Sequence, residues 1–127
     1  PALYYGVDLH SRKSWYHVHN CDRCMIEGDA ARIELPPSDI AIARQVFIHL
    51  SNEAILAILD NLRAAGVTWL LASTVPGGGA ANEDRLPGGV DYSIEGFPVD
   101  LDDDPFLLPY ALPVHRGGAM RLFSRRD

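Results

Sequence analysis

The clearest alternation of apolar and polar positions along the chain lies between Asp39 and Thr74. The run from Asp39 to Phe47 (D-I-A-I-A-R-Q-V-F) first alternates and then becomes nearly continuous, which predicts a strand covered on both faces. The run from Val67 to Ser73 (V-T-W-L-L-A-S) is rich in β-forming residues and predicts a second buried strand. A helix between two such strands implies a parallel, right-handed crossover.

The segment between these two strands has the signals of an amphipathic helix from about Asn52 to Ala65. Ser51 can cap its first turn with a side-chain oxygen, and Glu53 stands near the positive end of the helix dipole. Gly66 follows at the position where a left-handed residue ends a helix. The residues that recur at helical spacing and predict its buried face are Ile55, Leu56, Leu59 and Leu62.

Weaker patterns flank this unit on both sides. They predict a buried strand over Ala2 to Leu9, a short helix over Ser11 to Asn20, a brief strand over Met25 to Glu27, long ordered loops with one short strand from Pro76 to Pro113, and a closing strand over Ala119 to Ser124. The expected fold class is therefore α/β, a mostly parallel sheet with flanking helices. We expect residues 1–127 to form a single domain or the C-terminal part of one.

Composition narrows the classes of partner. The chain has 127 residues, 47% of them hydrophobic, which is enough for one hydrophobic core. Its formal net charge of −6 provides no excess of Lys and Arg for binding a nucleic-acid backbone. No apolar run approaches the roughly 20 residues that cross a bilayer, and the N-terminus lacks the order of a secretory signal. We therefore expect a cytoplasmic protein with no nucleic-acid or membrane partner.

The stretch H-V-H-N-C-D-R-C places four potential metal ligands, His17, His19, Cys21 and Cys24, within eight residues. Three interpretations are open: a zinc site, a redox pair, or ordinary surface and strand residues. Structural zinc usually joins distant segments, whereas these ligands are local and no second cluster follows. The preferred interpretation is therefore the ordinary one, with no metal.

In open parallel sheets, ligands bind beyond the carboxyl ends of the strands. The residues there are Asp8, Asp29, the stretch from Arg44 to His49, and Thr74 onward. A strand-end acid such as Asp8 can accept hydrogen bonds from the ribose hydroxyls of a nucleotide-like cofactor. It can equally serve as a helix cap or a turn acid.

Several stretches together resemble a class I S-adenosylmethionine-dependent methyltransferase. They are Y-Y-G-V-D-L at 4–9, I-E-G-D-A at 26–30, L-P-P-S-D-I-A-I-A-R-Q-V-F-I-H-L-S at 35–51, and the helix and strand through L-L-A-S-T. The resemblance is strongest from Leu35 to Thr74, where R-Q-V-F-I-H-L-S is similar to the segment after the fourth strand of these enzymes. The stretch from Pro87 to Pro109 looks like the substrate-side loop of one subgroup.

The resemblance implies S-adenosylmethionine as cofactor and assigns roles to particular residues. Asp8 would bind the ribose, and Asp29 would lie near the adenine amine. The residues that would line the cofactor edge are Arg44, Gln45 and Val46. His49 could take a proton from the nucleophile that receives the methyl group, or it could simply make a structural hydrogen bond beside the helix.

The chain departs from this family in one large respect. No strand with a glycine-rich turn precedes Asp8, and in the family that strand lies between the one ending at Asp8 and the one beginning at Asp39. The fold implied is therefore a truncated class I methyltransferase-like Rossmann fold. Its gap could be filled by a separate N-terminal half, by a second copy, or by direct pairing of the two flanking strands.

Two functions remain open at this point. The chain could transfer a methyl group to an unidentified acceptor once the N-terminal part complements it, or it could be a non-catalytic remnant used for binding or assembly. Because open edges recruit other chains, we expect a homodimer, with Leu3 to Val7 exchanged or at the interface, or else a complex with a separate N-terminal half.

Overall fold

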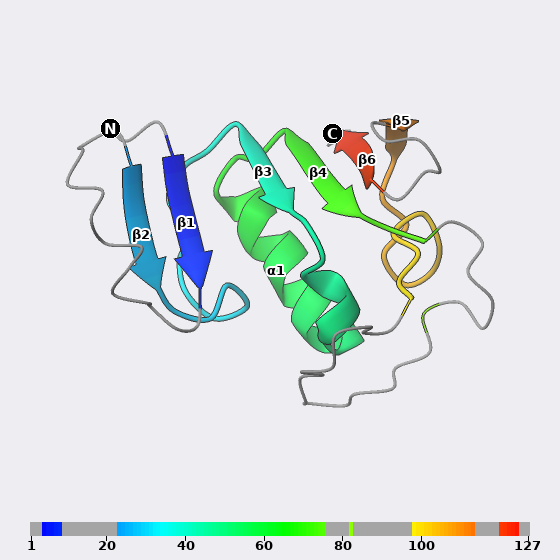
Figure 1. Cartoon of the computed structure of the whole chain (residues 1–127), viewed down its shortest axis with the longest axis horizontal. Coiled ribbons are helices and arrows are strands. Elements are labelled where there is room, and N and C mark those ends of the chain that lie inside the picture. Colours follow the sequence, from blue (N-terminus) through cyan, green and yellow to red (C-terminus); the bar gives the residue numbers. More distant parts are fainter. Residues whose placement is uncertain (1–3, 9–22, 76–81, 83–97, 114–119, 125–127) are drawn as a thin grey trace.

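The computed structural model describes residues 4–8, 23–75, 82, 98–113 and 120–124 (Figure 1). Its strands are β1 (Tyr4–Asp8), β2 (Arg23–Glu27), β3 (Ile40–Ala43), β4 (Trp69–Ser73), β5 (Tyr110–Pro113) and β6 (Met120–Ser124). Its helices are the 3₁₀ helix η2 (Phe47–His49) and the α-helix α1 (Asn52–Ala64). The described part of the chain is thus an α/β arrangement. The expected helix over Ser11 to Asn20 lies outside the described residues.

The strands form two sheets. In the smaller sheet β1 pairs in parallel with β2, and in the larger one the order is β3-β4-β6-β5. β3 and β4 are parallel, as the intervening helix predicts, while β6 runs antiparallel to both of its neighbours, β4 and β5. The parallel unit around α1, the brief strand β2 and the closing strand β6 are confirmed. β1 and β3 do not pair, so direct pairing of these two strands across the gap is wrong.

The helix α1 begins and ends where its capping residues predict. Ser51 Oγ accepts a hydrogen bond from the Ala54 amide at 3.2 Å, and Gly66 adopts a φ of 80° just after the helix. Its buried residues are Ile55, Ile58 and Leu59. Leu56, which the helical spacing placed on the buried face, is exposed, because that face is centred one position further round the helix.

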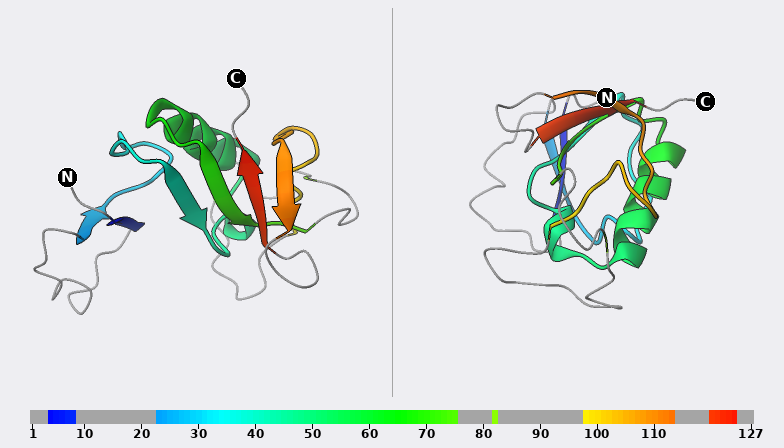
Figure 2. Two further views of the ribbon diagram at one scale, coloured as in Figure 1. Left: turned by 90° about the horizontal axis from the view of Figure 1, so that it is seen from above. Right: turned by 90° about the vertical axis from the view of Figure 1, so that its right-hand side faces the viewer.

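The core lies between α1 and one face of the larger sheet (Figure 2). Its residues come from the two parallel strands, η2, α1, the 98–109 segment and β6: Ala43, Phe47, Ile55, Ile58, Leu59, Leu70, Ala72, Val99, Leu101, Phe106 and Phe123. A single helix therefore covers a single face of this sheet in the described structure.

The strand predicted over Asp39 to Phe47 is shorter and less buried than expected. β3 ends at Ala43, and Gln45 then takes a left-handed conformation before the chain turns into η2. Ile40 and Ile42 are 52% and 64% exposed. The prediction of a strand covered on both faces is wrong for the described residues, because nothing among them packs on the face opposite α1.

Among the described residues, no helix combines the length and the apolar character needed to cross a bilayer.

Candidate functional site at the carboxyl ends of the parallel strands

The four parallel strands β1 to β4 point in the same direction, so their carboxyl ends share one edge of the molecule (Figure 1). Asp8 ends β1, and Asp29 follows β2 by two residues. The stretch from Arg44 to Val46 follows β3, and Thr74 follows β4. Asp8, Asp29, the 44–46 stretch and Thr74 therefore all follow or end strands at the edge where open parallel sheets bind ligands.

Asp8 has a carboxylate-bearing neighbour that the sequence analysis passed over. In the parallel register of β1 and β2, Asp8 stands opposite Glu27. Glu27 is exposed and ends its own strand. Two acids therefore terminate adjacent strands at this edge. The I-E-G-D stretch contained Glu27, but only the pairing of the strands could reveal its position beside Asp8.

Asp29 organises a turn at the same edge. Its Oδ1 accepts a hydrogen bond from the Ala31 amide at 2.9 Å, and its carbonyl accepts from the amides of Arg32 and Ile33. Its Oδ2 lies 3.6 Å from Arg32 Nε in an exposed ion pair, which adds little stability. The carboxylate caps its own turn and keeps unused lone pairs for a ligand.

The Asp29 turn is fastened to α1 by Asn61. The Asn61 Nδ2 group donates to the carbonyls of Ala30 and Ile33, at 2.9 and 3.2 Å. A Cβ at Gly28 would lie 2.9 Å from Ile33 Cγ2, so a larger residue there would force the Ile33 side chain to shift. Asn61 therefore positions Asp29 relative to the larger sheet, a role hidden in the sequence because Asn61 looks like an ordinary polar residue of the helix.

The end of β3 is held by a contact to β4. The Gln45 amide donates a hydrogen bond to Ser73 Oγ at 2.8 Å. The Ser73 hydroxyl in turn donates to Met120 Sδ in β6 at 3.1 Å. Gln45 has a φ of 54°, a conformation that costs a residue with a side chain about 1–3 kcal/mol. The side chains of Arg44, Gln45 and Val46 are exposed at this edge, free to line a bound ligand.

His49 is the last residue of η2, the 3₁₀ helix that follows the 44–46 stretch in the chain. Its amide donates to the Val46 carbonyl at 3.2 Å. Its side chain is half-buried, and its Nδ1 atom is buried with no hydrogen-bond partner among the described residues. The structural hydrogen bond weighed for this imidazole is therefore not formed through Nδ1 within the described part of the chain.

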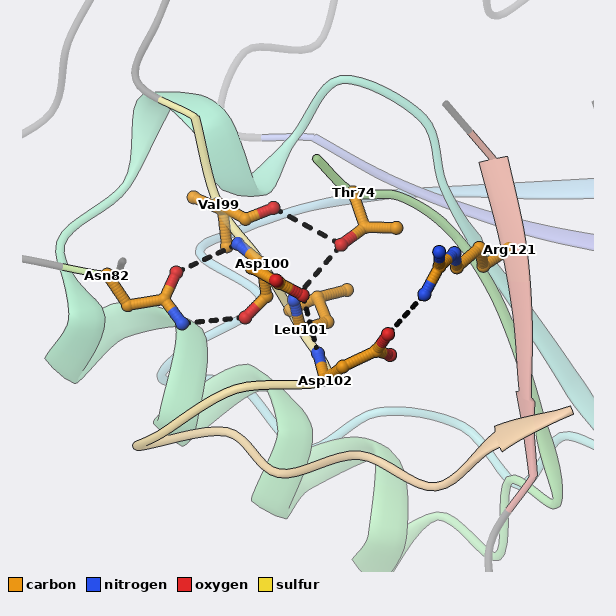
Figure 3. A network of polar contacts seen from close by, with 7 residues as sticks. All are labelled: Thr74, Asn82, Val99, Asp100, Leu101, Asp102 and Arg121. Carbon is orange, nitrogen blue, oxygen red and sulfur yellow. Dashed lines mark hydrogen bonds and ion pairs between the residues drawn. The ribbon is translucent and has the colours of Figure 1, made fainter. Parts of the chain in front are cut away.

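Beside the end of β4, a polar network fixes the 98–104 segment (Figure 3). Thr74 Oγ1 donates to the Val99 carbonyl at 3.2 Å and accepts from the Leu101 amide at 3.0 Å. Asn82 is buried in a left-handed conformation with a φ of 57°. Its Nδ2 donates to the carbonyls of Asp100 and Asp104, and its Oδ1 accepts from the Asp100 amide.

The same segment is joined to β6 by an ion pair between Asp102 and Arg121. The Arg121 side chain is 16% exposed and that of Asp102 is 32% exposed. Burial raises the pKa of the Asp102 carboxyl above its ordinary value, and the neighbouring Asp100 acts in the same direction, while the Arg121 guanidinium opposes both. Asp102 Oδ1 is buried and has no hydrogen-bond partner among the described residues.

The sequence analysis missed this network. Thr74 was noted only as a strand-end position, and Asn82, Asp100, Asp102 and Arg121 were not singled out. The D-L-D-D-D-P run at 100–105 is a local signal of a turn rich in acids. Its partners, however, stand 18 to 27 residues away in the chain, which no local pattern reveals.

Two hollows in the described surface lie elsewhere. One, of about 120 Å³, is lined by residues at the end of α1 and the beginning of β4, including Leu62, Val67 and Trp69. The other, of about 350 Å³, lies between the 32–37 segment and the same end of α1. Neither of these two hollows is lined by a predicted site residue.

The potential metal ligands fall mostly outside the described residues. His17, His19 and Cys21 lie there, while Cys24 is part of β2. In the described ranges, no group of three His, Cys, Asp or Glu side chains could hold a metal ion. The expectation that this stretch binds no metal stays a prediction.

Comparisons of the chain with protein-family models, with curated proteins and with solved structures found no match.

Proposed function

We propose that the chain is an S-adenosylmethionine-dependent methyltransferase-like domain that transfers a methyl group to a small or otherwise unidentified acceptor once its sheet is completed. The observation that carries the proposal is the order and direction of the strands. In class I methyltransferases a parallel sheet ends with one antiparallel strand inserted between its last two parallel strands. Here β6 is antiparallel and lies between β4 and β5.

The break between the two sheets also supports the proposal. The family places its first strand between the strands that correspond to β1 and β3, and these two strands are unpaired with each other here. The six described strands therefore lie in the order that the family fold has, with one position between β1 and β3 not occupied by a described strand. This likeness extends beyond the single strand–helix–strand unit that many α/β folds share.

The residues at the strand ends fit the nucleoside half of the cofactor. Asp8 would accept hydrogen bonds from the ribose hydroxyls, and Asp29 retains carboxylate lone pairs for the adenine amine. The exposed side chains of Arg44, Gln45 and Val46 would line the cofactor edge. In the family a glycine-rich turn after the first strand binds the methionine half, and the described residues provide no such turn.

The cofactor, when bound, supplies an electrophilic methyl group. The chain's own contribution is mainly to hold donor and acceptor in line at near-attack distance. In the proposed reaction, the acceptor's nucleophilic atom gains the methyl group and loses a proton, and His49 receives that proton. His49 is the candidate for this role because its Nδ1 atom has no hydrogen-bond partner among the described residues.

The direct test is calorimetric titration of the full chain with S-adenosylhomocysteine, the demethylated product. Saturable binding supports the proposal. Adenosine is a useful second ligand, because the strand-end residues would contact only the nucleoside half. If neither compound binds, and binding is also absent once the sheet is completed by an added segment, the proposal is wrong.

A binding or assembly module without catalysis is the second candidate. The observation that favours it is that the described strands form two separate sheets, with β1 and β3 not paired with each other. Cofactor binding separates the two candidates, because an assembly module needs none.

A further inference from the structure

Two consecutive hydrogen bonds link the carboxyl end of β3 to β6 by way of β4. The Gln45 amide donates to Ser73 Oγ at 2.8 Å, and the Ser73 hydroxyl donates its own proton to Met120 Sδ at 3.1 Å. The hydroxyl therefore accepts on one side and donates on the other. Because hydrogen bonds in such a chain polarise one another, the strength with which Ser73 holds the Gln45 amide depends on its bond to the sulfur atom.

The fold brings these three residues together from distant parts of the sequence. Ser73 ends β4 and Met120 begins β6, and the two are direct partners in the antiparallel register of these neighbouring strands (Figure 1). Gln45 follows β3, which is the parallel neighbour of β4 on its other side. The sulfur atom thus lies beside the hydroxyl because of strand pairing, although Ser73 and Met120 are 47 positions apart in the chain.

Gln45 is the residue on which these two bonds act. Its φ of 54° lies in the left-handed region, which a residue with a side chain keeps only when its surroundings hold it there. The Ser73 hydroxyl is the group that receives its amide. The side chains of Arg44 and Gln45 are exposed at this edge. A change at the Ser73 hydroxyl therefore reaches the backbone that directs these two side chains.

Met120 brings a chemical property that other apolar residues lack, because its thioether sulfur can be oxidised. The Met120 side chain is partly exposed, so a small oxidant can reach it. With hydrogen peroxide, the sulfur forms a bond to one peroxide oxygen while the O–O bond breaks. The sulfur gives up two electrons, and the other oxygen leaves as water with both protons. The product is methionine sulfoxide, a polar side chain that methionine sulfoxide reductases convert back.

A sulfoxide does not fit the contact between Met120 and Ser73. A hydroxyl and an oxygen acceptor need about 2.5–3.0 Å between their oxygen atoms, whereas Ser73 Oγ and Met120 Sδ are only 3.1 Å apart. An oxygen added to the sulfur on this side therefore displaces the hydroxyl. An oxygen added on the other side makes the side chain more polar and draws it towards water, which also ends the contact.

We infer that Met120 is a site of reversible oxidation by peroxides, and that its sulfoxide loosens the hold of Ser73 on the Gln45 amide. The contacts from Gln45 N to Ser73 Oγ and from Ser73 Oγ to Met120 Sδ carry this inference. It goes beyond the proposed function, because the two hydrogen bonds are present whatever this edge binds. Oxidation would alter the lining of any ligand held there through the backbone at Gln45.

Peroxide treatment of the full chain, followed by mass spectrometry of its peptides, tests the first part. Met120 is expected to gain one oxygen atom while the chain stays folded. The same treatment in urea gives the reactivity of Met120 in the unfolded chain. If Met120 stays unmodified in the folded chain at a peroxide concentration that oxidises it in urea, the inference is wrong.

Hydrogen exchange measured by NMR tests the second part. In the oxidised chain the Gln45 amide is expected to exchange at least about tenfold faster than in the reduced chain. The Ile55 amide, which donates to the Ser51 carbonyl in the first turn of α1, is the reference and should keep its rate. Treatment with methionine sulfoxide reductases should restore the slower exchange of Gln45. Unchanged exchange of Gln45, or equal acceleration of Ile55, would overturn the inference.

Three variants make the result specific. Met25→Leu leaves Met120 as the single methionine, so the response of Gln45 to peroxide should persist. Met120→Leu keeps an apolar side chain of similar volume without the sulfur, and the response should be lost. Ser73→Ala removes the connecting hydroxyl, so oxidation of Met120 should no longer change the exchange of Gln45.

The same variants supply the contrary outcomes. Loss of the response in Met25→Leu would assign it to the other methionine, and an equal response in Ser73→Ala would show that it does not pass through the hydroxyl. Either result contradicts the inference. None of these measurements involves a cofactor, so failure of the proposed function leaves this test intact.

Discussion

The amide of Gln45 and the hydroxyl of Ser73 tie the carboxyl ends of β3 and β4 together across 28 residues of sequence, with an N···Oγ distance of 2.8 Å. This bond holds Gln45 in the left-handed region. Replacing Ser73 with Ala should lower the free energy of unfolding by about 1 kcal/mol, as for a typical lost hydrogen bond. Chemical denaturation measures this change. Ser38→Ala is a matched control, because in the described structure the Ser38 hydroxyl donates to the carbonyl of Pro36, two residues away.

The conformation of Gln45 gives a second prediction. Glycine adopts a φ of 54° without steric cost, so Gln45→Gly should leave the free energy of unfolding within about 1 kcal/mol of the original chain. Gln45→Val should lower it by about 1–3 kcal/mol, because a β-branched residue is strained there. Equal effects of the two substitutions, seen in denaturant titrations, would contradict the left-handed conformation.

The helix α1 offers a test of the core. Leu59→Ala should cost about 2–5 kcal/mol, because Leu59 is buried against the sheet. Leu56→Ala is the matched control on the same helix, and it should cost less than about 1 kcal/mol because Leu56 is exposed. Thermal and urea unfolding of both variants measure the difference. If Leu59→Ala costs less than about 1 kcal/mol, the helix packs against the sheet differently.

Asn82 should be among the most sensitive polar residues. Its side chain makes three hydrogen bonds to the 100–104 segment and is buried. Asn82→Ala leaves those backbone groups unsatisfied and strains a left-handed position, so we expect a loss of more than about 2 kcal/mol. Asn82→Asp keeps the acceptor for the Asp100 amide but replaces the donor that faces two carbonyls. It should therefore be destabilising as well, as calorimetric unfolding would show.

The parts of the fold that the sequence predicted are those with local signals. The Ser51 cap, the Gly66 stop and the apolar runs defined α1, β4 and β6 with small errors at their ends. The exposure of Ile42 could not be predicted, because an apolar strand has the same sequence pattern whether or not another element packs on its outer face. The same limit applies to the site. Strand-end acids are visible in the sequence, whereas the Asp102–Arg121 pair depends on packing between segments 19 residues apart.

Asp102 gives a prediction for pH dependence. Burial raises its pKa above the ordinary value of 3.8 despite Arg121, so the folded chain holds this proton more tightly than the unfolded chain does. The charged carboxylate therefore reduces stability above the raised pKa, and this cost disappears as the pH falls through the raised pKa towards 3.8. Asp102→Asn lacks the titrating group. The free energy of unfolding of the original chain minus that of the variant should therefore rise as the pH is lowered from about 7 to about 4. A fall in this difference would mean that Arg121 outweighs burial.

The last prediction concerns the strand-end acids and depends on the proposed cofactor. If S-adenosylhomocysteine binds, Asp8→Ala should weaken binding by about 1.5–3 kcal/mol, the range for hydrogen bonds to a charged group. Asp29→Ala should have a smaller effect, because contact with an adenine amine is a single bond and because Asp29 also serves its own turn. Asp39→Ala is the matched control, since Asp39 is an exposed acid at the opposite, amino end of β3. Calorimetric titration of the three folded variants measures these effects. Equal affinity of the Asp8 and Asp39 variants would remove Asp8 from the site, because an electrostatic effect of net charge alone would act on both alike.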